Sequence, residues 1–354
     1  MKRALIFLLR RAVAGLLTIV VMITLAFTVF WATPTQPARF IYLSPALSSY
    51  QIQHGNHLLG ADRPKLEQWA HYVTHLPRGD FGTAWEGARV VGNSKVTEYP
   101  IAPFVDPALR ETLSLLLGGA ALVLLLAVPL GAFAGSRIGS IGDRTVSLVA
   151  LIGICTHPMV IGILVRSLFA GRVHWLPPSG YCPLIRSPAG GCGGLVDWAS
   201  HLALPWLTFA LLFLALYVRM VRTSVAETMH EDFVRTARAK GATELRVLGR
   251  HVLPNAALRV LTMVGMEIGT AIGVSIYIEA TFGLHGLASS AVFAMAGNGA
   301  ALDLPFILAL VFLISAIVVV GNLTVDAFYV FFDPRATLGG GRAATTKVAA
   351  GGVI

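Results

Sequence analysis

Residues 222–255 read RTSVAETMHEDFVRTARAKGATELRVLGRHVLPN, and they form the longest polar segment between two apolar runs of membrane length. The segment is rich in arginine and lysine, which under the positive-inside rule indicates a cytoplasmic location. Its pattern predicts two short helices. Glu231 and Asp232 suit the amino terminus of the first helix and Arg238 and Lys240 its carboxyl terminus, because the helix dipole favours anions and cations at those ends. Gly241 suits the left-handed position that follows a helix.

A second helix is predicted between Thr243, a good N-cap residue, and Pro254, which we expect to end it. Apolar side chains recur at helical spacing in both helices. The pairs are Phe233 with Ala237 and Leu245 with Leu248. This spacing predicts that each helix presents a small apolar patch to water, where a membrane protein is expected to dock a partner as a helix in a groove. The alternative is a basic cytoplasmic loop with no special role.

The segment resembles the EAA loop of binding-protein-dependent ABC-importer permeases, in which Glu-Ala-Ala, three residues, Gly and nine residues precede Ile-x-Leu-Pro. Aligned on Gly241, the chain has Arg235, Thr236 and Ala237 in place of Glu-Ala-Ala, and His251–Pro254 in place of Ile-x-Leu-Pro. The Glu, one Ala and the Ile of that pattern are therefore missing. The variant EDFVRTARAKGAT is nevertheless similar to the form found in the peptide/nickel branch, that of the dipeptide and oligopeptide permeases.

The resemblance implies that this loop carries a coupling helix that docks on an ATPase subunit. The residues expected to take part are Glu231, Asp232, Phe233, Arg235, Ala237, Arg238, Ala239, Lys240, Gly241, Leu245 and Leu248. No G-x-x-x-x-G-K-[ST] phosphate loop occurs in the chain, so ATP and Mg²⁺ are expected on partner ATPase subunits and no cofactor on this chain. The resemblance further implies two such ATPase subunits, a second homologous permease subunit in a heterodimer, and an extracytoplasmic substrate-binding protein.

The composition is that of an integral membrane protein. Of 354 residues, 55% are hydrophobic and 13% charged, and the mean hydropathy is +0.72. A net charge of +9 suggests nucleic acid in a soluble chain. Here 17 of the 27 lysine and arginine residues fall on the expected cytoplasmic side, so the charge is explained by orientation in a lipid bilayer. We therefore expect no nucleic-acid partner.

Six apolar runs have the length of a membrane span. The first, Ala12–Ala32, follows Lys2, Arg3, Arg10 and Arg11, and it is longer than the roughly 7–15 apolar residues of a cleaved signal peptide. The others are Thr112–Ser136, Thr145–Val165, Trp198–Val218, Val260–Ile278 and Leu304–Val325. The sequence thus predicts an all-α, polytopic membrane protein with six transmembrane helices and both termini in the cytoplasm. The resemblance implies that this membrane is the bacterial plasma (inner) membrane.

Further motifs divide the chain. Residues 1–32 are expected to hold the cytoplasmic amino terminus and the first helix, 33–110 an extracytoplasmic domain, 111–335 the permease core with its loop at 222–255, and 336–354 a disordered tail. Within 33–110, Asp62-Arg63-Pro64 predicts a helix start, and Arg78–Trp85 (RGDFGTAW) resembles the Gly-Asp-Leu/Phe-Gly-x-Ser motif of peptide permeases. Glu279–Leu287 and Asp333-Pro334-Arg335 also resemble family motifs. Together these imply the type I ABC-importer permease fold, with a small external domain between helices 1 and 2.

Three ionisable residues fall within or at the ends of expected spans. Glu267 lies about 12 Å along the fifth span from Arg259, at ~1.5 Å per residue, and either lines the substrate path or makes a buried polar contact. By the same count Arg166 and Glu279 lie about 31 Å and about 30 Å along their spans. A shared depth predicts that they pair near an external gate, and the alternative is that Arg166 reaches outward to water. Glu279, Phe282 and Gly283 are assigned to that gate on the resemblance alone.

Cysteine and histidine positions suggest one covalent link. Cys182 and Cys192 lie in the expected external loop 171–197, where a disulfide is plausible, whereas Cys155 falls inside the third span and is expected to pack. Glu67, His71 and His75 follow i, i+4, i+8 spacing, which is a possible metal-binding face, although a plain solvated helix face explains them as well. We expect no metal site.

These features favour a permease subunit of an ATP-driven ABC importer that moves dipeptides and oligopeptides inward by alternating access. Import of nickel or another small solute by the same mechanism is the alternative. A stand-alone secondary transporter is a different class, but it predicts paired broken helices in two halves, which the sequence lacks. A membrane enzyme needs a reactive cluster at membrane depth, and the chain offers only scattered single residues. No catalytic residue is therefore assigned.

Overall fold

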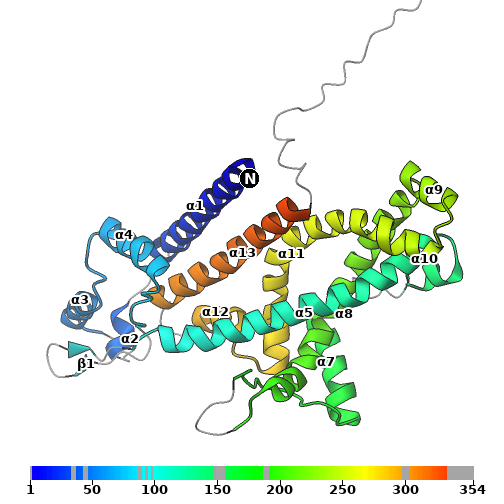
Figure 1. The fold of residues 1–354 in the computed structure, drawn as a ribbon. Coiled ribbons are helices and arrows are strands. Elements are labelled where there is room, and N and C mark those ends of the chain that lie inside the picture. Colours follow the sequence, from blue (N-terminus) through cyan, green and yellow to red (C-terminus); the bar gives the residue numbers. More distant parts are fainter. Residues whose placement is uncertain are drawn as a thin grey trace, which may run out of the picture.

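The computed structural model describes residues 2–32, 37–42, 47–85, 90–91, 95–96, 99–146, 148, 156–185, 191–296 and 303–332. Among these residues, regular structure is helical apart from one two-stranded ribbon. Long helices dominate Figure 1, and they are α1 (Lys2–Ala32), α5 (Ala102–Ser136), α8 (Leu195–Thr228), α11 (Leu253–Phe282) and α13 (Leu304–Phe332). In the described part of the chain these five are long and apolar enough to cross a membrane.

The apolar runs mark these helices but not their ends. Five of the six expected spans lie inside the five long helices, which run further on one or both sides. For example, α5 begins at Ala102 and α8 continues to Thr228, whereas the apolar runs begin at Thr112 and end at Val218. Polar residues at the rims of the bilayer are compatible with a helix, so a count of apolar residues underestimates its length.

The third expected span, Thr145–Val165, is not an uninterrupted helix. Residues 147 and 149–155, with Cys155, lie outside the described residues, and a new helix, α7 (Pro158–Arg166), begins after them. His157 is extended and its Nδ1 accepts a hydrogen bond from the Met159 backbone N–H (3.3 Å), so it caps α7. Proline fits the first turn of a helix because its missing N–H has no partner there. The expectation of a continuous helix through Pro158 is therefore wrong.

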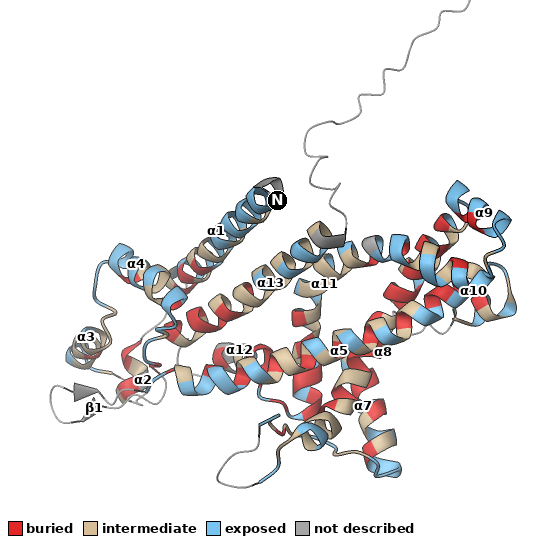
Figure 2. Ribbon diagram, in the orientation of Figure 1, coloured by how far each residue is buried: buried red, intermediate tan, exposed pale blue. Residues whose placement is uncertain are grey.

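The main core lies between α5 and α8, which α7 and α11 flank (Figure 1). Small residues on α5 let the two helix backbones approach closely. A Cβ at Gly131 would lie 2.6 Å from Val221 Cβ, and one at Gly135 would lie 2.5 Å from the carbonyl oxygen of Arg222. Such glycines serve close packing in membrane helices, where the hydrophobic effect does not drive helices together. Figure 2 shows the resulting band of buried residues along α8.

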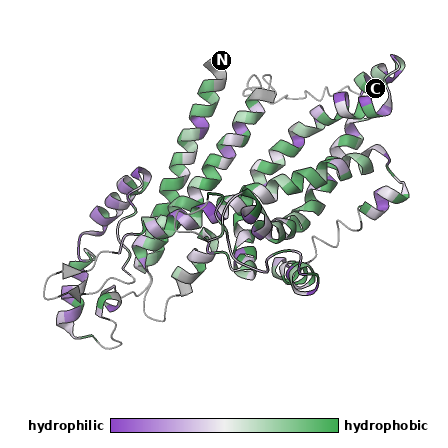
Figure 3. Cartoon of the chain, turned by 60° about the horizontal axis from the view of Figure 1, so that its bottom comes forward, coloured by the Kyte–Doolittle hydropathy of each residue, from purple (hydrophilic) through white to green (hydrophobic). Residues whose placement is uncertain are grey.

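A second core joins α1 and α13 to the segment between α1 and α5. That segment contains α2 (Ala38–Tyr42), α3 (Ser49–Leu58), α4 (Lys65–His75), the 3₁₀ turn η1 (Leu76–Arg78), and the antiparallel strands β1 (Val90–Val91) and β2 (Lys95–Val96). The indole N–H of Trp69 on α4 donates to Thr24 Oγ1 on α1 (3.0 Å), and Leu76 is fully buried. This polar segment is distinct in Figure 3 from the predominantly hydrophobic long helices.

Five short elements complete the described chain. They are the π-turn η2 (Ser167–Arg172) after α7, the helices α9 (Asp232–Ala239) and α10 (Glu244–Val247) with the π-turn η3 (Leu248–Val252) between α8 and α11, and α12 (Leu287–Ala296) after α11. Figure 1 places α9 and α10 at the end of the molecule away from α2, α3 and α4. The two polar parts of the chain therefore lie at opposite ends of the apolar helices.

Candidate functional site

The segment between α8 and α11 contains the two short helices that its sequence predicts. Glu231 occupies the N-cap position of α9 in extended conformation, and Asp232 stands in the first turn. Arg238 lies in the last turn, Lys240 is the C-cap, and Gly241 follows with φ +80°. The Gly241 N–H donates to the carbonyl of Arg238 (2.9 Å), and only glycine adopts this left-handed turn without steric cost.

An ion pair fixes α9 relative to α10. The guanidinium of Arg238 donates to both carboxylate oxygens of Glu244, with Nε–Oε1 2.8 Å and an NH2–Oε2 distance of 3.1 Å. This forked geometry sets direction as well as distance. Hydrogen bonding from Arg238 lowers the pKa of Glu244, so the carboxylate stays ionised and the contact persists at neutral pH. The sequence analysis predicted Arg238 near the carboxyl end of the first helix, but it did not predict that Glu244 is its partner.

The two helices have one buried face and one exposed face. Val234 on α9 and Val247 on α10 are fully buried, and Ala237 is 8% exposed. On the other side, Phe233 is 41% exposed and Leu245 is 81% exposed. The expectation that Ala237 and Leu248 face water is wrong, because Ala237 is buried and the half-buried Leu248 packs against the main core. The exposed apolar surface is thus formed by Phe233 and Leu245, one from each helix.

Pro254 does not end the second helix. The chain passes from α10 through the π-turn Leu248–Val252 directly into α11, and Pro254 stands in the first turn of α11. A proline at that position needs no hydrogen-bond partner for its nitrogen, so it starts a helix as readily as it stops one. The loop is therefore continuous with the helix that follows it.

Ion pairs also attach the segments next to this loop. Asp143 accepts hydrogen bonds from the Arg222 guanidinium on α8 (NH2–Oδ2 2.8 Å) and from the Gly139 N–H (2.9 Å). Arg222 thereby holds the turn that follows α5, and the sequence alone did not indicate this contact. These contacts lower the pKa of Asp143 to about 2, with the Arg222 hydrogen bond as the largest cause. Similarly, Glu227 on α8 pairs with Arg259 on α11.

At the far end of α11, Glu279 is fully buried and holds a turn together. Its Oε1 accepts the hydroxyl of Thr112 on α5 (2.8 Å), and its Oε2 accepts the N–H of Ser289 on α12 (2.7 Å). The Thr112 oxygen in turn accepts the N–H of Leu287 (2.8 Å). A Cβ at Gly286 would lie 2.4 Å from Glu279 Oε1, which explains the glycine. Glu279 therefore joins three helices.

The expected pairing of Arg166 with Glu279 is wrong. The Arg166 guanidinium donates to the backbone carbonyl of Thr281 (2.8 Å), whereas the Glu279 carboxylate faces Thr112 and Ser289. The two residues do share a depth, as the count along the helices predicts. Arg166 on α7 reaches the backbone of α11 at Thr281, whereas the Glu279 side chain leaves α11 toward α5 and α12, a direction that a count along the axis does not provide.

The other residues assigned to the gate lie at the same turn. Phe282 is 1% exposed and its carbonyl accepts the N–H of Gly180 (2.9 Å), so the loop after α7 is attached to the end of α11. Gly283 follows with φ +63° as the helix ends. In that loop Cys182 and Cys192 form a disulfide, with their Cα atoms 5.6 Å apart.

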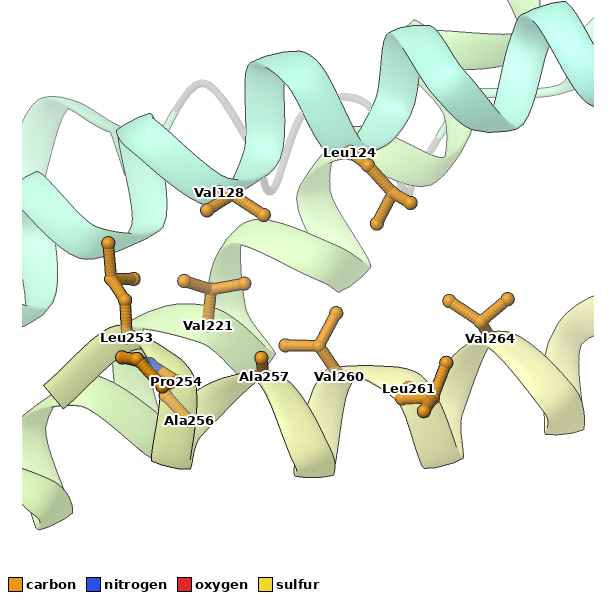
Figure 4. A pocket seen from close by; sticks show the side chains of 10 residues that line it. All are labelled: Leu124, Val128, Val221, Leu253, Pro254, Ala256, Ala257, Val260, Leu261 and Val264. Atoms are coloured by element: carbon orange, nitrogen blue, oxygen red, sulfur yellow. The ribbon is translucent and has the colours of Figure 1, made fainter. Parts of the chain in front are cut away.

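Two adjoining cavities lie between the long helices. Figure 4 shows the smaller, of about 410 Å³, whose wall is made by side chains such as Val128 of α5, Val221 of α8 and Val260 of α11. The larger, of about 630 Å³, extends to α13 and contains Glu267 in its wall. Both walls are almost wholly apolar, and Leu124, Leu261 and Val264 belong to both. Glu267 thus faces a cavity rather than a polar contact within the described chain.

The described residues hold no cluster of three metal-ligating side chains. On α4 the rings of His71 and His75 stack with centroids 4.0 Å apart, and burial lowers the pKa of His71. Glu67 instead pairs with Arg63 (3.6 Å). These contacts account for the three residues as part of a helix surface.

Two family models of membrane transport proteins match this chain. A family described as "Binding-protein-dependent transport system inner membrane component" matches residues 127–338, and the N-terminal component of the same system matches residues 4–116. The chain belongs to this family. Such a permease is a transport subunit in the inner membrane and not a catalytic enzyme, and its family implies partnership with ATPase subunits and a substrate-binding protein.

Curated relatives resemble the permease over nearly its whole length. The oligopeptide transport system permease protein AppB of Bacillus subtilis is 28% identical over 329 residues, which cover 93% of this chain and 98% of AppB. The glutathione transport system permease protein GsiC of Salmonella typhimurium is 30% identical over 93% of this chain and 97% of GsiC. The "Probable peptide ABC transporter permease protein y4tP" of Sinorhizobium fredii is 29% identical, with coverage of 93% and 98%.

Several important residues had no signal in the sequence. Asp143 bonds to a partner 79 residues away in the chain, and Thr112 bonds to one 167 residues away. Gly286 matters because a larger residue there would meet the Glu279 carboxylate. Each is an ordinary residue type in its local sequence. Glu244 stands six residues from Arg238, a spacing that crosses a turn and fits no helical pair. Gly286 and Glu244 lie inside stretches that the sequence analysis quoted, but neither stretch indicates their partners.

Proposed function

We propose that this chain is a permease subunit that moves peptides inward across the plasma membrane, driven by ATP hydrolysis on partner subunits. The observation that carries the proposal is the surface of Phe233 and Leu245, which the Arg238–Glu244 ion pair holds in place at one end of the helices. An apolar pair exposed on a rigid, polar segment suits docking into a groove of another protein. The coupling residues expected from the sequence gather in this segment.

The proposed assembly has a second homologous permease, two ATPase subunits that bind ATP and Mg²⁺, and an extracytoplasmic binding protein. In this arrangement the chain crosses the membrane six times, in the orientation that the basic residues favour. Both the amino terminus and the tail 336–354 are then in the cytoplasm. The segment 33–110 then faces outward, where α2, α3 and α4 form a small external domain. Closure of the ATPases would move the loop 222–255 and switch the core 111–335 between outward-open and inward-open states.

The buried turn at Glu279 supports a role at the outer end of the path. Glu279, Phe282 and Gly283 connect α11 to α5, α12 and the disulfide-closed loop, so a movement of α11 reaches all three. Arg166 contributes through the Thr281 carbonyl. We propose that this turn is the external gate, held by hydrogen bonds rather than by an ion pair.

Peptides are the favoured substrate because the printed names of the relatives are those of peptide, oligopeptide and glutathione permeases. The test is uptake by proteoliposomes that contain the complete transporter with its binding protein. We expect ATP-dependent uptake of radiolabelled di- and tripeptides, competed by unlabelled peptides and not by Ni²⁺. Uptake of nickel alone would contradict the peptide assignment and leave the permease assignment intact.

The docking surface is tested in the same system. Phe233→Asp with Leu245→Asp should abolish both co-purification of the ATPase subunits and uptake, because two carboxylates cannot enter an apolar groove without a large desolvation cost. Leu66→Asp is the matched control, since Leu66 on α4 is 75% exposed but lies at the other end of the molecule. Normal uptake by the double variant would refute the docking role.

A further inference from the structure

Among the residues that the structure describes, the larger cavity has one acidic side chain in its wall. Glu267 on α11 is accompanied by leucine, valine, isoleucine, alanine and phenylalanine side chains from α5, α8, α11 and α13. Tyr217 and Thr324 contribute the other polar side chains, and the hydroxyl of Thr324 is already bonded to the carbonyl of Val320 (2.8 Å). The described residues that line this cavity include no lysine, arginine or histidine.

Within the part of the chain that the structure describes, no side chain or backbone N–H donates a hydrogen bond to Glu267, and no cation pairs with it. In contrast, Glu279 on the same helix accepts bonds from Thr112 and Ser289. Two carboxylates on one membrane helix are therefore treated differently: Glu279 is satisfied inside the fold and Glu267 is left facing a cavity.

A carboxylate at this depth is costly unless a cation or a donor reaches it. Glu267 is about 12 Å from Arg259 and about 22 Å from Phe282 along α11, at ~1.5 Å per residue, so it is far from both rims. Apolar walls strengthen any interaction with a cation that enters. The site therefore calls for a positively charged group supplied from outside this chain.

The apolar wall around Glu267 suits ligands of varied shape that share one chemical group. Apolar contact is non-directional, and the aromatic side chains of Phe209, Phe213 and Phe328 accept groups of varied size. A volume of about 630 Å³ lies within the range of small-ligand sites. One fixed negative charge within such a wall suits molecules that share a single cationic group and differ in their apolar parts.

We propose that Glu267 binds the α-ammonium group of the transported peptide while the apolar wall receives its side chains. The proposal rests on the function proposed above, since peptides share that ammonium whatever their sequence. Because the wall offers no cation, the carboxylate of the peptide points away from it. Glu267 is then a specificity-determining residue for the amino end of the substrate.

The test compares trialanine with N-acetyl-trialanine, which lacks the ammonium, in proteoliposomes of the complete transporter at saturating binding protein. Glu267→Gln should lower the turnover of trialanine about tenfold, because a neutral amide oxygen replaces the carboxylate in a charge-assisted hydrogen bond, and should leave N-acetyl-trialanine unchanged. Glu267→Asp keeps the charge and should retain most of the discrimination. Thr324→Val is the matched control, because it removes a hydroxyl from the same wall and should affect both peptides equally.

Three results would overturn the proposal. Equal loss for both peptides would assign Glu267 to the architecture of the cavity. Loss of co-purification of the second permease in Glu267→Gln would assign the carboxylate to a cation of that subunit. Unchanged uptake of both peptides would show that the substrate does not reach Glu267, while peptide import itself would stand. Failure of the wild-type complex to import either peptide would instead remove the proposed function, and the proposal with it.

Discussion

Removal of the Glu279 carboxylate should destabilise the turn at the end of α11 by an amount that the structure allows us to estimate. In Glu279→Ala the hydroxyl of Thr112 and the N–H of Ser289 lose the acceptors that lie 2.8 Å and 2.7 Å away. Both donors are buried, so water cannot replace the carboxylate. The variant tests whether this buried acid stabilises the turn or is merely tolerated there.

The expected loss follows from the number of donors left without a partner. Each unsatisfied buried donor costs about 1–3 kcal/mol, so two cost about 2–6 kcal/mol. At roughly 2 °C per kcal/mol for a chain of this size, Glu279→Ala should lower the thermal midpoint by about 4–12 °C. Glu279→Gln keeps one acceptor and should lose about half as much.

The assay is the thermal unfolding midpoint of the purified complex, followed by intrinsic fluorescence in one detergent at pH 7. Glu67→Ala is the control, because Glu67 is exposed on α4 and pairs only with the exposed Arg63. Its midpoint should match the wild type. A Glu279→Ala midpoint within 1 °C of the wild type would refute the reasoning, since it would mean that the donors find other partners at no cost.

Other contacts give further predictions. Gly286→Ala should lower the thermal midpoint, because its Cβ would lie 2.4 Å from Glu279 Oε1, whereas Gly171→Ala, with open space around it, should not. Arg238→Ala should reduce ATP-driven uptake more than Arg235→Ala, because Arg238 bridges α9 to α10 while Arg235 pairs within α9; equal effects would contradict the role of the bridge. Asp143 has a depressed pKa of about 2, so its stabilising contribution is complete above the unfolded value near 4 and is lost only as pH falls through about 2. Asp143→Asn should therefore lower the midpoint by a constant amount from pH 5 to 8, and a difference that varies over that range would count against this assignment. Cys182→Ser with Cys192→Ser should lower the free energy of unfolding by about 2–3 kcal/mol and so lower the midpoint, and dithiothreitol should lower the midpoint of the wild type but not that of the double variant.

The long apolar helices and the short helices of the loop at 222–255 were predictable because their signals are local. Apolar runs identify α1, α5, α8, α11 and α13, and the charges of residues 231–240 together with Gly241 identify α9 and its end. These features depend on hydrophobic length, the helix dipole and backbone conformation, all of which a short window of sequence determines.

The contacts between segments were not predictable in the same way. Arg166 and Glu279 were matched by depth, but the direction of a side chain around a helix decides its partner, and Arg166 reaches Thr281 instead. Pro158 was expected inside a span and Pro254 at the end of a helix, but both stand in the first turn of a helix, where proline is well accepted. The sequence pattern alone does not distinguish these two positions.

The bond between Cys182 and Cys192 has a consequence for how the protein matures. Disulfides persist in oxidising compartments and are rare in the reducing cytosol. If the loop between α7 and α8 emerges outside the cell interior, the bond can close only after that loop has crossed the bilayer. Its formation then records the completed insertion of the preceding helices, and the fraction of oxidised chain during synthesis becomes a readout of orientation in the membrane.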